Sequence, residues 1–289
     1  MNQKNTLIYL LIAIFSISII LSSFTNPSSK STTYRSAKKN IAIVQLLGPI
    51  SPKQNALQPN DVDNTIQTIL NLQKNPNVDA VILRVNSPGG TVGSSQELFQ
   101  TILNFKKQSS KPIVASIADI GASGAYYAIM GCDKIFANPG SMVGSIGVKV
   151  SNLDLTEVTK KIGIGQNLYK SGAFKDILSS WRKPTSKESK IVQSMVDNIH
   201  DQFVTSLSQA RNISYKKAKQ LSDGRIFTGS QSVENGLIDE LGGLQSTIEF
   251  LKAQLNAQHG VNIIHQHKLP IQQIFNQIKR QLYSDLSLF

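Results

Sequence analysis

Cysteine and histidine are scarce in this chain of 289 residues. The one cysteine, Cys132, excludes an internal disulfide framework and a cysteine-based zinc cluster, and we expect it to be a small buried thiol. The four histidines are His200, His259, His265 and His267. Three of them fall in a glutamine-rich C-terminal stretch, so few histidines remain for acid–base catalysis.

Acidic residues are outnumbered, and nucleotide-binding motifs are absent. The chain has 30 Lys and Arg against 18 Asp and Glu, a net charge of +12, and five of these positive charges lie in residues 1–40, which contain no acid. The remainder is only mildly basic and has no basic stripe with interleaved aromatics, so we expect no nucleic-acid partner. The glycine-rich turns contain no G-x-G-x-x-G and no glycine followed by Lys-Ser/Thr, which argues against a phosphate loop.

What the sequence does have is a long apolar run near its start. Leu7 to Phe24 is rich in Leu and Ile, and no charged residue occurs from Asn5 to Ser29. As a helix this run would be roughly 27 Å long, close to the ~30 Å of a bilayer core. A cleaved signal peptide usually has a shorter apolar region followed by an A-x-A-like site, so we expect an uncleaved anchor. The expected segments are a flank at 1–6, a transmembrane anchor at 7–24 and a polar linker at 25–40.

The next part of the chain alternates strand-like and helix-like patterns. Residues 41–46, 79–85 and 112–118 are short apolar runs typical of buried strands, while 61–75 and 91–108 carry apolar residues at helical spacing. Repeated β–turn–α units indicate a mainly parallel sheet covered by helices, hence an α/β fold. With 40% apolar residues the chain can bury a sizeable core.

Further elements are expected after residue 141. The sequence predicts a strand at 144–150, a helix at 155–163, a strand edge at 167–174 and a long helix at about 186–212. In the long helix, apolar residues recur every four positions and predict a face for the core or for a subunit contact: Ile191, Met195, Ile199, Phe203 and Leu207. We expect the folded domain to span 41–255, and 256–289 to be an appendage, either an amphipathic helix or a partly disordered tail.

Two glycine-rich turns follow two of the predicted strands. They are NSPGG at 86–90 and DIGASGAYY at 119–127. Ligands of open α/β sheets bind at the carboxyl ends of the strands, so both turns are expected to face one cleft. Ser123 could then act as a nucleophile beside backbone amides that form an oxyanion hole, although each turn alone could be a simple tight turn.

A nucleophilic Ser123 needs a base. His200 lies within the long predicted helix and is expected to be a surface or packing residue, so a Ser-His-Asp triad is poorly supported. A lysine is the natural alternative, but it must be neutral, and desolvation lowers a lysine pKa by at most about 3–5 units. Chemistry alone leaves Lys149 and Lys170 open as such bases.

Five motifs in order extend this interpretation. NSPGG, ASGAYY, GSMVGSIGV, KSGAFKDIL and DGRIFTGSQSVENGLIDELGG together resemble the signal peptide peptidase A (SppA) family of Ser-Lys serine proteases, from about Ile41 to Leu251. A single copy of each motif with one anchor is similar to the short, single-domain bacterial form. The resemblance implies a Clp protease/crotonase-like fold of repeated β-β-α units.

The resemblance also assigns roles to residues. It implies Ser123 as nucleophile, Lys175 as general base and Ser145 as the residue that orients the lysine amine. The amide of Gly124, with that of Gly89 or Gly90, would form the oxyanion hole. No metal ion or other cofactor is implied.

The same resemblance implies substrate, assembly and location. The expected partners are peptide substrates, namely remnant signal peptides cut within their apolar segment, together with the lipid bilayer and further copies of the chain. In a bowl-like homo-oligomer one subunit could complete a neighbour's site and keep it dry. The count of basic residues on either side of the anchor would put the body in the cytoplasm, whereas the resemblance implies the extracytoplasmic side of a bacterial cell membrane, which we adopt.

Two other classes of function stay open from the sequence. A crotonase-type acyl-CoA enzyme would share the fold and the glycine-rich oxyanion turns, but it would need an Asp or Glu base in the cleft. A catalytically silent membrane scaffold would keep the sheet without reactivity.

Overall fold

The computed structural model describes residues 38–52 and 62–265. Its strands are β1 (Lys39–Leu47), β2 (Ala80–Ser87), β3 (Ile113–Ala122), β4 (Lys134–Ala137), β5 (Met142–Gly144), β6 (Ile226–Thr228), β7 (Glu240–Leu241) and β8 (Val261–His265). Its helices are α2 (Val62–Lys74), α3 (Val92–Gln108), α4 (Gly124–Ile129), α5 (Thr156–Lys161), α6 (Ser186–Ala210), α7 (Tyr215–Gln220), α8 (Gly229–Glu234) and α9 (Leu244–Gln254).

The strands form one mixed but mainly parallel sheet. Its order is β6-β5-β3-β2-β1-β8, with β4 joined to both β3 and β7. Among the described strands, only β5 and β6 pair antiparallel. The predicted α/β class is therefore confirmed, and the carboxyl ends of β2 and β3 lie at one edge, since Ser87 is in register with Gly121.

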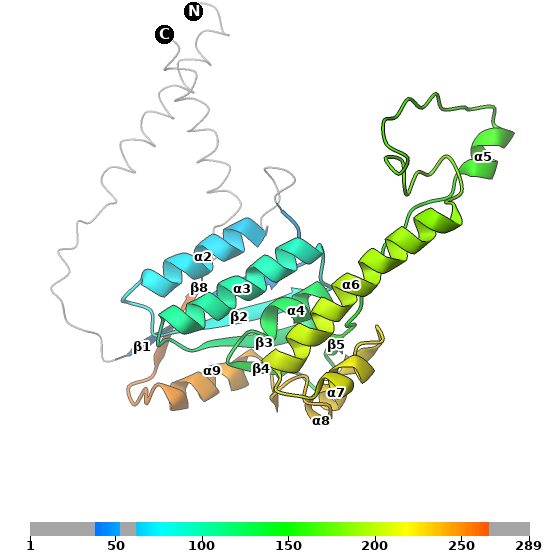
Figure 1. Ribbon diagram of the computed structural model, residues 1–289. Helices are drawn as coiled ribbons and strands as arrows, with labels where there is room; N and C mark the ends of the chain where they lie inside the picture. The colour runs from blue at the N-terminus through cyan, green and yellow to red at the C-terminus, as the bar shows by residue number, and fades with distance from the viewer. Residues whose placement is uncertain (1–37, 53–61, 266–289) are drawn as a thin grey trace, which may run out of the picture. The chain divides into compact units, whose positions relative to one another are not determined.

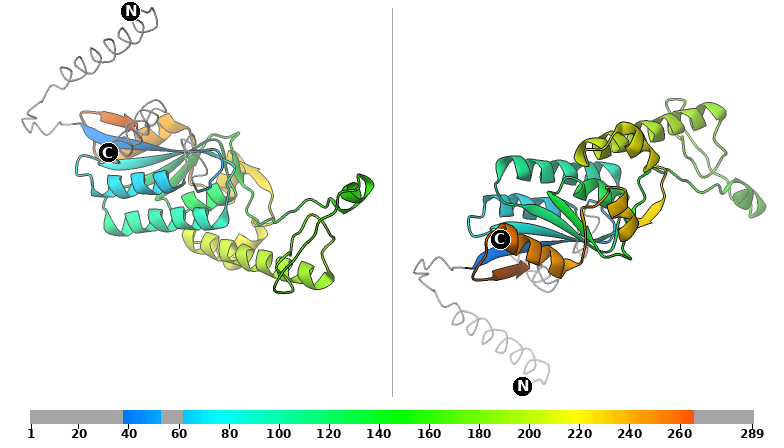
Figure 2. Two further views of the ribbon diagram at one scale, coloured as in Figure 1. Left: turned by 90° about the horizontal axis from the view of Figure 1, so that it is seen from above. Right: turned by 90° about the horizontal axis from the view of Figure 1, so that it is seen from below.

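Helices cover both faces of the sheet (Figures 1 and 2). Side chains along β1 alternate between the two faces, as the period of a strand requires. Val44 and Leu46 pack in the larger core beneath α2 and α3, whereas Ile41 and Ile43 pack with Leu251 of α9 on the other face. Cys132 is buried, as predicted, and burial raises the pKa of its thiol.

Two predicted strands are wrong. The strand expected at 144–150 is limited to β5, which ends at Gly144, because Gly144 and Ser145 have φ values of +92° and +49° and leave the extended region. The segment expected as a strand edge at 167–174 forms bends and irregular chain. Its side chains are exposed, and Gly172 has a φ of +88°. No strand in the described part of the chain pairs with this stretch, so nothing holds it in an extended conformation.

The long helix is confirmed as α6. It begins with a capping box, in which the Thr185 hydroxyl accepts from the Glu188 amide and the Glu188 carboxylate accepts from the Thr185 amide. Only the C-terminal half of the predicted apolar face is buried. Phe203 and Leu207 are in the core, whereas Ile191 and Met195 are 41% and 45% exposed.

Residues 150–185, which we call the arm, lie with α5 beyond the N-terminal end of α6 and away from the sheet (Figures 1 and 2). Strand β8 falls within the stretch expected as an appendage, yet it pairs in parallel with β1. The predicted anchor at 7–24 and most of its linker lie outside the described residues. Within 38–52 and 62–265, none of the helices combines the length and apolar character that crossing a bilayer requires.

Candidate active site

Ser123 occupies a strained turn between β3 and α4. Its φ of 53° and ψ of −124° are rare for a residue with a side chain, and such strain concentrates at functional sites. Its amide donates to the Gly144 carbonyl at 2.7 Å, and its carbonyl accepts from the Tyr127 amide at 2.9 Å. These bonds fix the strand–turn–helix geometry that exposes a nucleophile at the end of a strand.

The NSPGG turn lies directly against this serine. A Cβ atom on Gly89, whose φ is +94°, would come within 2.6 Å of the Gly124 nitrogen and 2.9 Å of the Ser123 Cβ. A Cβ on Gly124 would lie 2.3 Å from the Ser95 Oγ and 3.1 Å from the Gly90 nitrogen. The backbones can approach this closely only because both positions are glycine.

Two amides at this contact have no hydrogen-bond acceptor among the described residues. Gly124 is the first residue of α4, so its amide has no intrahelical acceptor. The parallel bridge between Ile50 and Gly90 uses the Gly89 carbonyl and the Thr91 amide, each at 2.9 Å, and leaves the Gly90 amide on the other side. The Gly89 amide donates to Ser87 Oγ at 3.2 Å. Gly90 and Gly124 therefore offer the pair of donors that an oxyanion hole needs.

A cavity of about 740 Å³ contains this arrangement. Five of the six residues predicted for the site line it: Gly89, Gly90, Ser123, Gly124 and Ser145. Ser145 follows the carbonyl that accepts from the Ser123 amide, and its own amide donates to the Arg225 carbonyl at 2.8 Å.

Lys175 does not line the Ser123 cavity of its own chain. It is exposed and lies in a turn of the arm, where its amide donates to the Gly172 carbonyl at 3.3 Å. Lys149 lines the cavity instead, while Lys170 forms an ion pair with Asp176. The single chain thus brings the serine, the amides and Ser145 together but leaves Lys175 apart from them.

Several cavity residues were not singled out as site residues from the sequence. His200 of α6 lines the cavity, and its Nε2 lies 2.6 Å from the Ser222 carbonyl oxygen. Tyr127 and Phe203 add an aromatic wall, with ring centroids 4.7 Å apart. The four-residue periodicity of α6 carried the signal for Phe203, but which surface that face packs against was not visible in the sequence.

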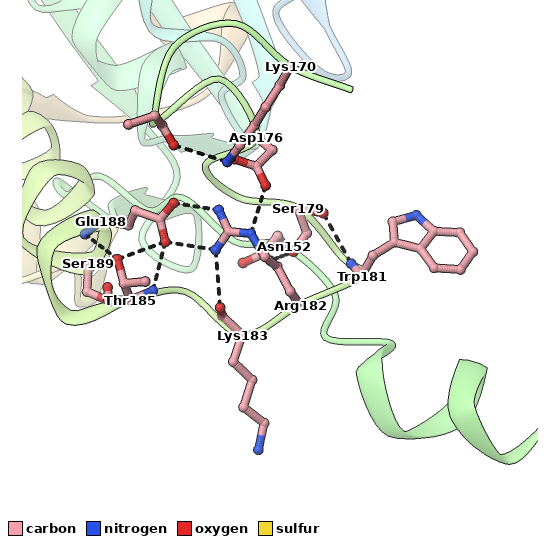
Figure 3. Close-up of polar contacts among 11 residues, drawn as sticks. Asn152, Lys170, Asp176, Ser179, Trp181, Arg182, Lys183, Thr185, Glu188 and Ser189 are labelled. Atoms are coloured by element: carbon pink, nitrogen blue, oxygen red, sulfur yellow. Dashed lines mark hydrogen bonds and ion pairs between the residues drawn. The ribbon is translucent and has the colours of Figure 1, made fainter. Parts of the chain in front are cut away.

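The carboxylate of Asp176, the residue after Lys175, already has two cationic partners (Figure 3). Asp176 pairs with Arg182 and with Lys170, and these two cations hold the pKa of the carboxyl well below its usual range. The Arg182 guanidinium, with the Thr185 amide, lowers the pKa of Glu188 to about 2. Both acids therefore stay ionised at neutral pH.

Comparison with known proteins points to one family. Residues 105–258 match the family described as Peptidase family S49. A relative from Enterococcus faecium named "Putative signal peptide peptidase SppA" is 38% identical over 191 residues, which cover 66% of this chain and 55% of the relative. "Putative protease slr0021" of Synechocystis is 38% identical over 207 residues, 72% of this chain and 71% of that protein. "Protease 4" of Haemophilus influenzae is 31% identical over 75% of this chain and 35% of its own length. The match thus spans about half of the Enterococcus protein.

Proposed function

The chain belongs to peptidase family S49, and from that premise we propose that it is a membrane-anchored serine endopeptidase with a Ser-Lys dyad. Its proposed substrates are remnant signal peptides, cut within their apolar segment. The observation that carries the proposal is the strained Ser123, in one cavity with Gly90 and Gly124, whose amides have no acceptor among the described residues.

The cavity supports acyl transfer. The Ser123 Oγ would attack the scissile carbonyl, and the resulting oxyanion would accept from the Gly90 and Gly124 amides. A lysine amine would take the serine proton and return it to the leaving amine, which leaves an acyl-enzyme for water to hydrolyse. Ser145, at the cavity wall, is the proposed hydrogen-bonding partner that aims the amine.

The proposed base is Lys175 of a second copy of the chain. Lys175 is exposed and outside its own chain's cavity, so with Lys175 as the base the site would need another subunit. The arm around it carries a set of exposed apolar side chains, namely Leu153, Val158, Ile162, Ile164, Leu168, Tyr169 and Trp181. Exposed apolar side chains that gather on one segment favour an interaction site. Their burial against a neighbour would exclude water from the amine and so favour the neutral form that a base requires.

The apolar part of the cavity wall supports the proposed substrate class. Val92, Val148, Val196 and Ile199 join Tyr127 and Phe203 in lining the cavity. Such a surface suits the apolar side chains of a signal-peptide remnant. We further propose a Clp protease/crotonase-like fold of β-β-α units and a bowl-like homo-oligomer. The body would face the extracytoplasmic side of a bacterial cell membrane, held by the anchor predicted at 7–24.

A crotonase-type acyl-CoA enzyme is the second candidate, because two carboxylates, Asp197 and Asp223, line the cavity. Both already have partners. The Asp223 carboxylate pairs with Arg225, and the Asp197 carboxylate accepts from Gln193 at 2.7 Å. Family membership also favours the peptidase.

Cleavage of an apolar, signal-like peptide by the detergent-solubilised full chain tests the proposal. We expect Ser123→Ala and Lys175→Ala to fold and to lose activity, and a fluorophosphonate to label Ser123 in the parent. Gly140→Ala is the control, because a Cβ there would have no neighbour within 4 Å. No cleavage by the parent would favour the acyl-CoA enzyme or a silent scaffold, and full activity of Lys175→Ala would reassign the base.

A further inference from the structure

Four charged residues of alternating sign, spaced six positions apart, form a chain of ion pairs that links the arm to the first turn of α6 (Figure 3). They are Lys170, Asp176, Arg182 and Glu188, called here the four-charge cluster. Arg182 is its centre. Its Nε donates to the Asp176 Oδ2 at 2.7 Å, and its Nη1 and Nη2 donate to the two oxygens of Glu188. A planar guanidinium can make all three bonds at once.

Glu188 fixes one end of the cluster to α6. Its carboxylate accepts from the Thr185 amide at 2.7 Å and from the Thr185 hydroxyl at 2.9 Å, as part of the capping box. The Glu188 side chain is only 4% exposed. Arg182 therefore ties the turn that carries Lys175 to the first turn of a 25-residue helix.

Asp176 is the other end of the tie and the immediate neighbour of Lys175. Its side chain is 9% exposed, with Oδ2 facing Arg182 and Oδ1 facing Lys170. The Lys170 ammonium also donates to the Ala173 carbonyl at 3.2 Å, which closes the turn around Lys175. A carboxylate without these partners would attract the Lys175 ammonium and favour its charged, non-basic form.

Three further charged residues of the arm and of the first turn of α6 are Lys187, Asp154 and Lys183. The Lys187 ammonium lies 5.2 Å from the centroid of the Phe174 ring. The Asp154 carboxylate accepts from the Thr156 amide at 3.0 Å, and Lys183 acts on it electrostatically. Within the described residues none of these three groups bonds to Asp176, whose cationic partners are Arg182 and Lys170.

We propose that Arg182 is a positioning residue for Lys175. By bridging Asp176 and Glu188, it holds the Lys175 turn against α6 and keeps the Asp176 carboxylate away from the Lys175 amine. This role rests on the proposed function of Lys175 as the base. Arg182 itself touches neither substrate nor the reacting atoms.

The test is the pH profile of kcat/KM for the full chain in detergent, with a fluorogenic peptide of Leu and Ala as the probe. In Arg182→Gln a nearby cation is lost and Asp176 is partly freed, and both changes favour the protonated amine. The rising limb should move to higher pH by about half a unit or more. Asp176→Asn should move the limb to lower pH, and adding it to Arg182→Gln should move the limb back toward the parent.

Controls separate positioning from general damage. Lys252→Gln removes the cation of an exposed ion pair on α9 and should leave the limb in place. Arg182→Lys keeps the charge but cannot bridge both acids, so kcat should fall while the limb stays closer to that of the parent than in Arg182→Gln. If Arg182→Gln does not fold, the pH profiles of Asp176→Asn and Arg182→Lys are compared with that of the parent instead.

The outcomes that overturn the inference are distinct from those that overturn the function. If Lys175→Ala is inactive but neither Arg182→Gln nor Asp176→Asn moves the limb, Arg182 has only a structural role. If Lys175→Ala retains activity, the proposed base is wrong and the role of Arg182 fails with it.

Discussion

The amide of Ser123 donates a 2.7 Å hydrogen bond to the carbonyl of Gly144, the residue before Ser145. The bond joins the ends of β3 and β5 and brings two serines with positive φ, 53° and 49°, to one cavity. Because neighbouring strands hold both strained turns, the sheet rather than the loops sets the geometry of Ser123, the proposed nucleophile, and of Ser145, its proposed partner in orienting the lysine. This arrangement leads to the predictions that follow.

Adding a methyl group at Gly124 should disable the oxyanion hole. The new Cβ would lie 2.3 Å from the Ser95 Oγ and 3.1 Å from the Gly90 nitrogen, so it would push the two amides apart. We expect kcat for Gly124→Ala to fall about 10²–10³-fold, as for loss of an oxyanion donor. Steady-state peptide cleavage measures this, with Gly140→Ala as the matched control. A fully active Gly124→Ala would remove this amide from the mechanism.

Two inactive variants should restore activity when they are combined. If Lys175 serves a neighbour's Ser123, co-expressed Ser123→Ala and Lys175→Ala chains form some sites that hold both native residues. For random assembly through head-to-tail contacts, roughly a quarter of the sites should be complete. Differently tagged chains, purified together through both tags, allow the activity to be compared with the parent. Persistent inactivity of the mixed oligomer would place the base within the same chain.

Lys149 is the lysine to test against Lys175, because it lines the cavity of its own chain. We expect Lys149→Ala to keep kcat within about tenfold of the parent, a change of roughly 1.4 kcal/mol or less in the activation free energy. Lys175→Ala should lose activity. The reverse result would identify Lys149 as the base and would make a second subunit unnecessary.

Removing the Phe203 ring should destabilise the cavity wall. Phe203 is buried and its ring lies 4.7 Å from that of Tyr127, centroid to centroid. We expect Phe203→Ala to lower the free energy of unfolding by about 3–5 kcal/mol. Urea denaturation measures this loss, and Ser194→Ala, at an exposed position of the same helix, should change it by less than about 0.5 kcal/mol. A loss below 1 kcal/mol would mean that the site collapses around the gap.

The capping box of α6 should weaken in acid. The Arg182 guanidinium and the Thr185 amide lower the pKa of Glu188 in the folded protein to about 2 from its ordinary value of 4.5. The contribution of Glu188 to stability is therefore fully present above about pH 4.5 and is lost as the pH falls toward 2. The pKa of Asp176 is depressed as well, and its contribution fades in the same direction. The hydrogen-exchange protection factors of the first turn of α6, which correct for the pH dependence of the chemical exchange step, should therefore fall across this window. In Glu188→Gln these protection factors should be low already at pH 6 and should change little on acidification.

Most of the sheet could be predicted from the sequence, because its strands are local apolar runs. The strands at 41–46 and 79–85 and the helix at 91–108 are present in the structure within a few residues. The prediction of a strand at 144–150 was wrong because the chain leaves the extended conformation at Ser145, which has a positive φ. The pairing of β5 with β3 and the bond from the Ser145 amide to the Arg225 carbonyl hold this conformation, and the side-chain pattern gives no sign of it. The short β8 was missed because its five residues pair with β1, more than 200 positions away.

Part of the candidate site could likewise be predicted from the sequence, and part of it could not. Glycine-rich turns after buried strands predicted that the two turns face one cleft, and the structure shows in addition that Gly89 packs against Gly124. Our preference for the Gly90 amide over that of Gly89 depends on the hydrogen bond from the Gly89 amide to Ser87 Oγ, and only coordinates can give that bond. The position of Lys175 relative to a serine depends, in our proposal, on a contact between chains, which no pattern within one chain encodes.

The even spacing of the four-charge cluster also limits how this part of the chain can change in length. Loops generally accept insertions, yet one extra residue between Asp176 and Arg182, or between Arg182 and Glu188, would put the guanidinium out of reach of one of its carboxylates. Residues 170–188 have few regular elements but a fixed length. Relatives with insertions or deletions should therefore carry them outside this interval, and a library of single-residue insertions should tolerate them least there.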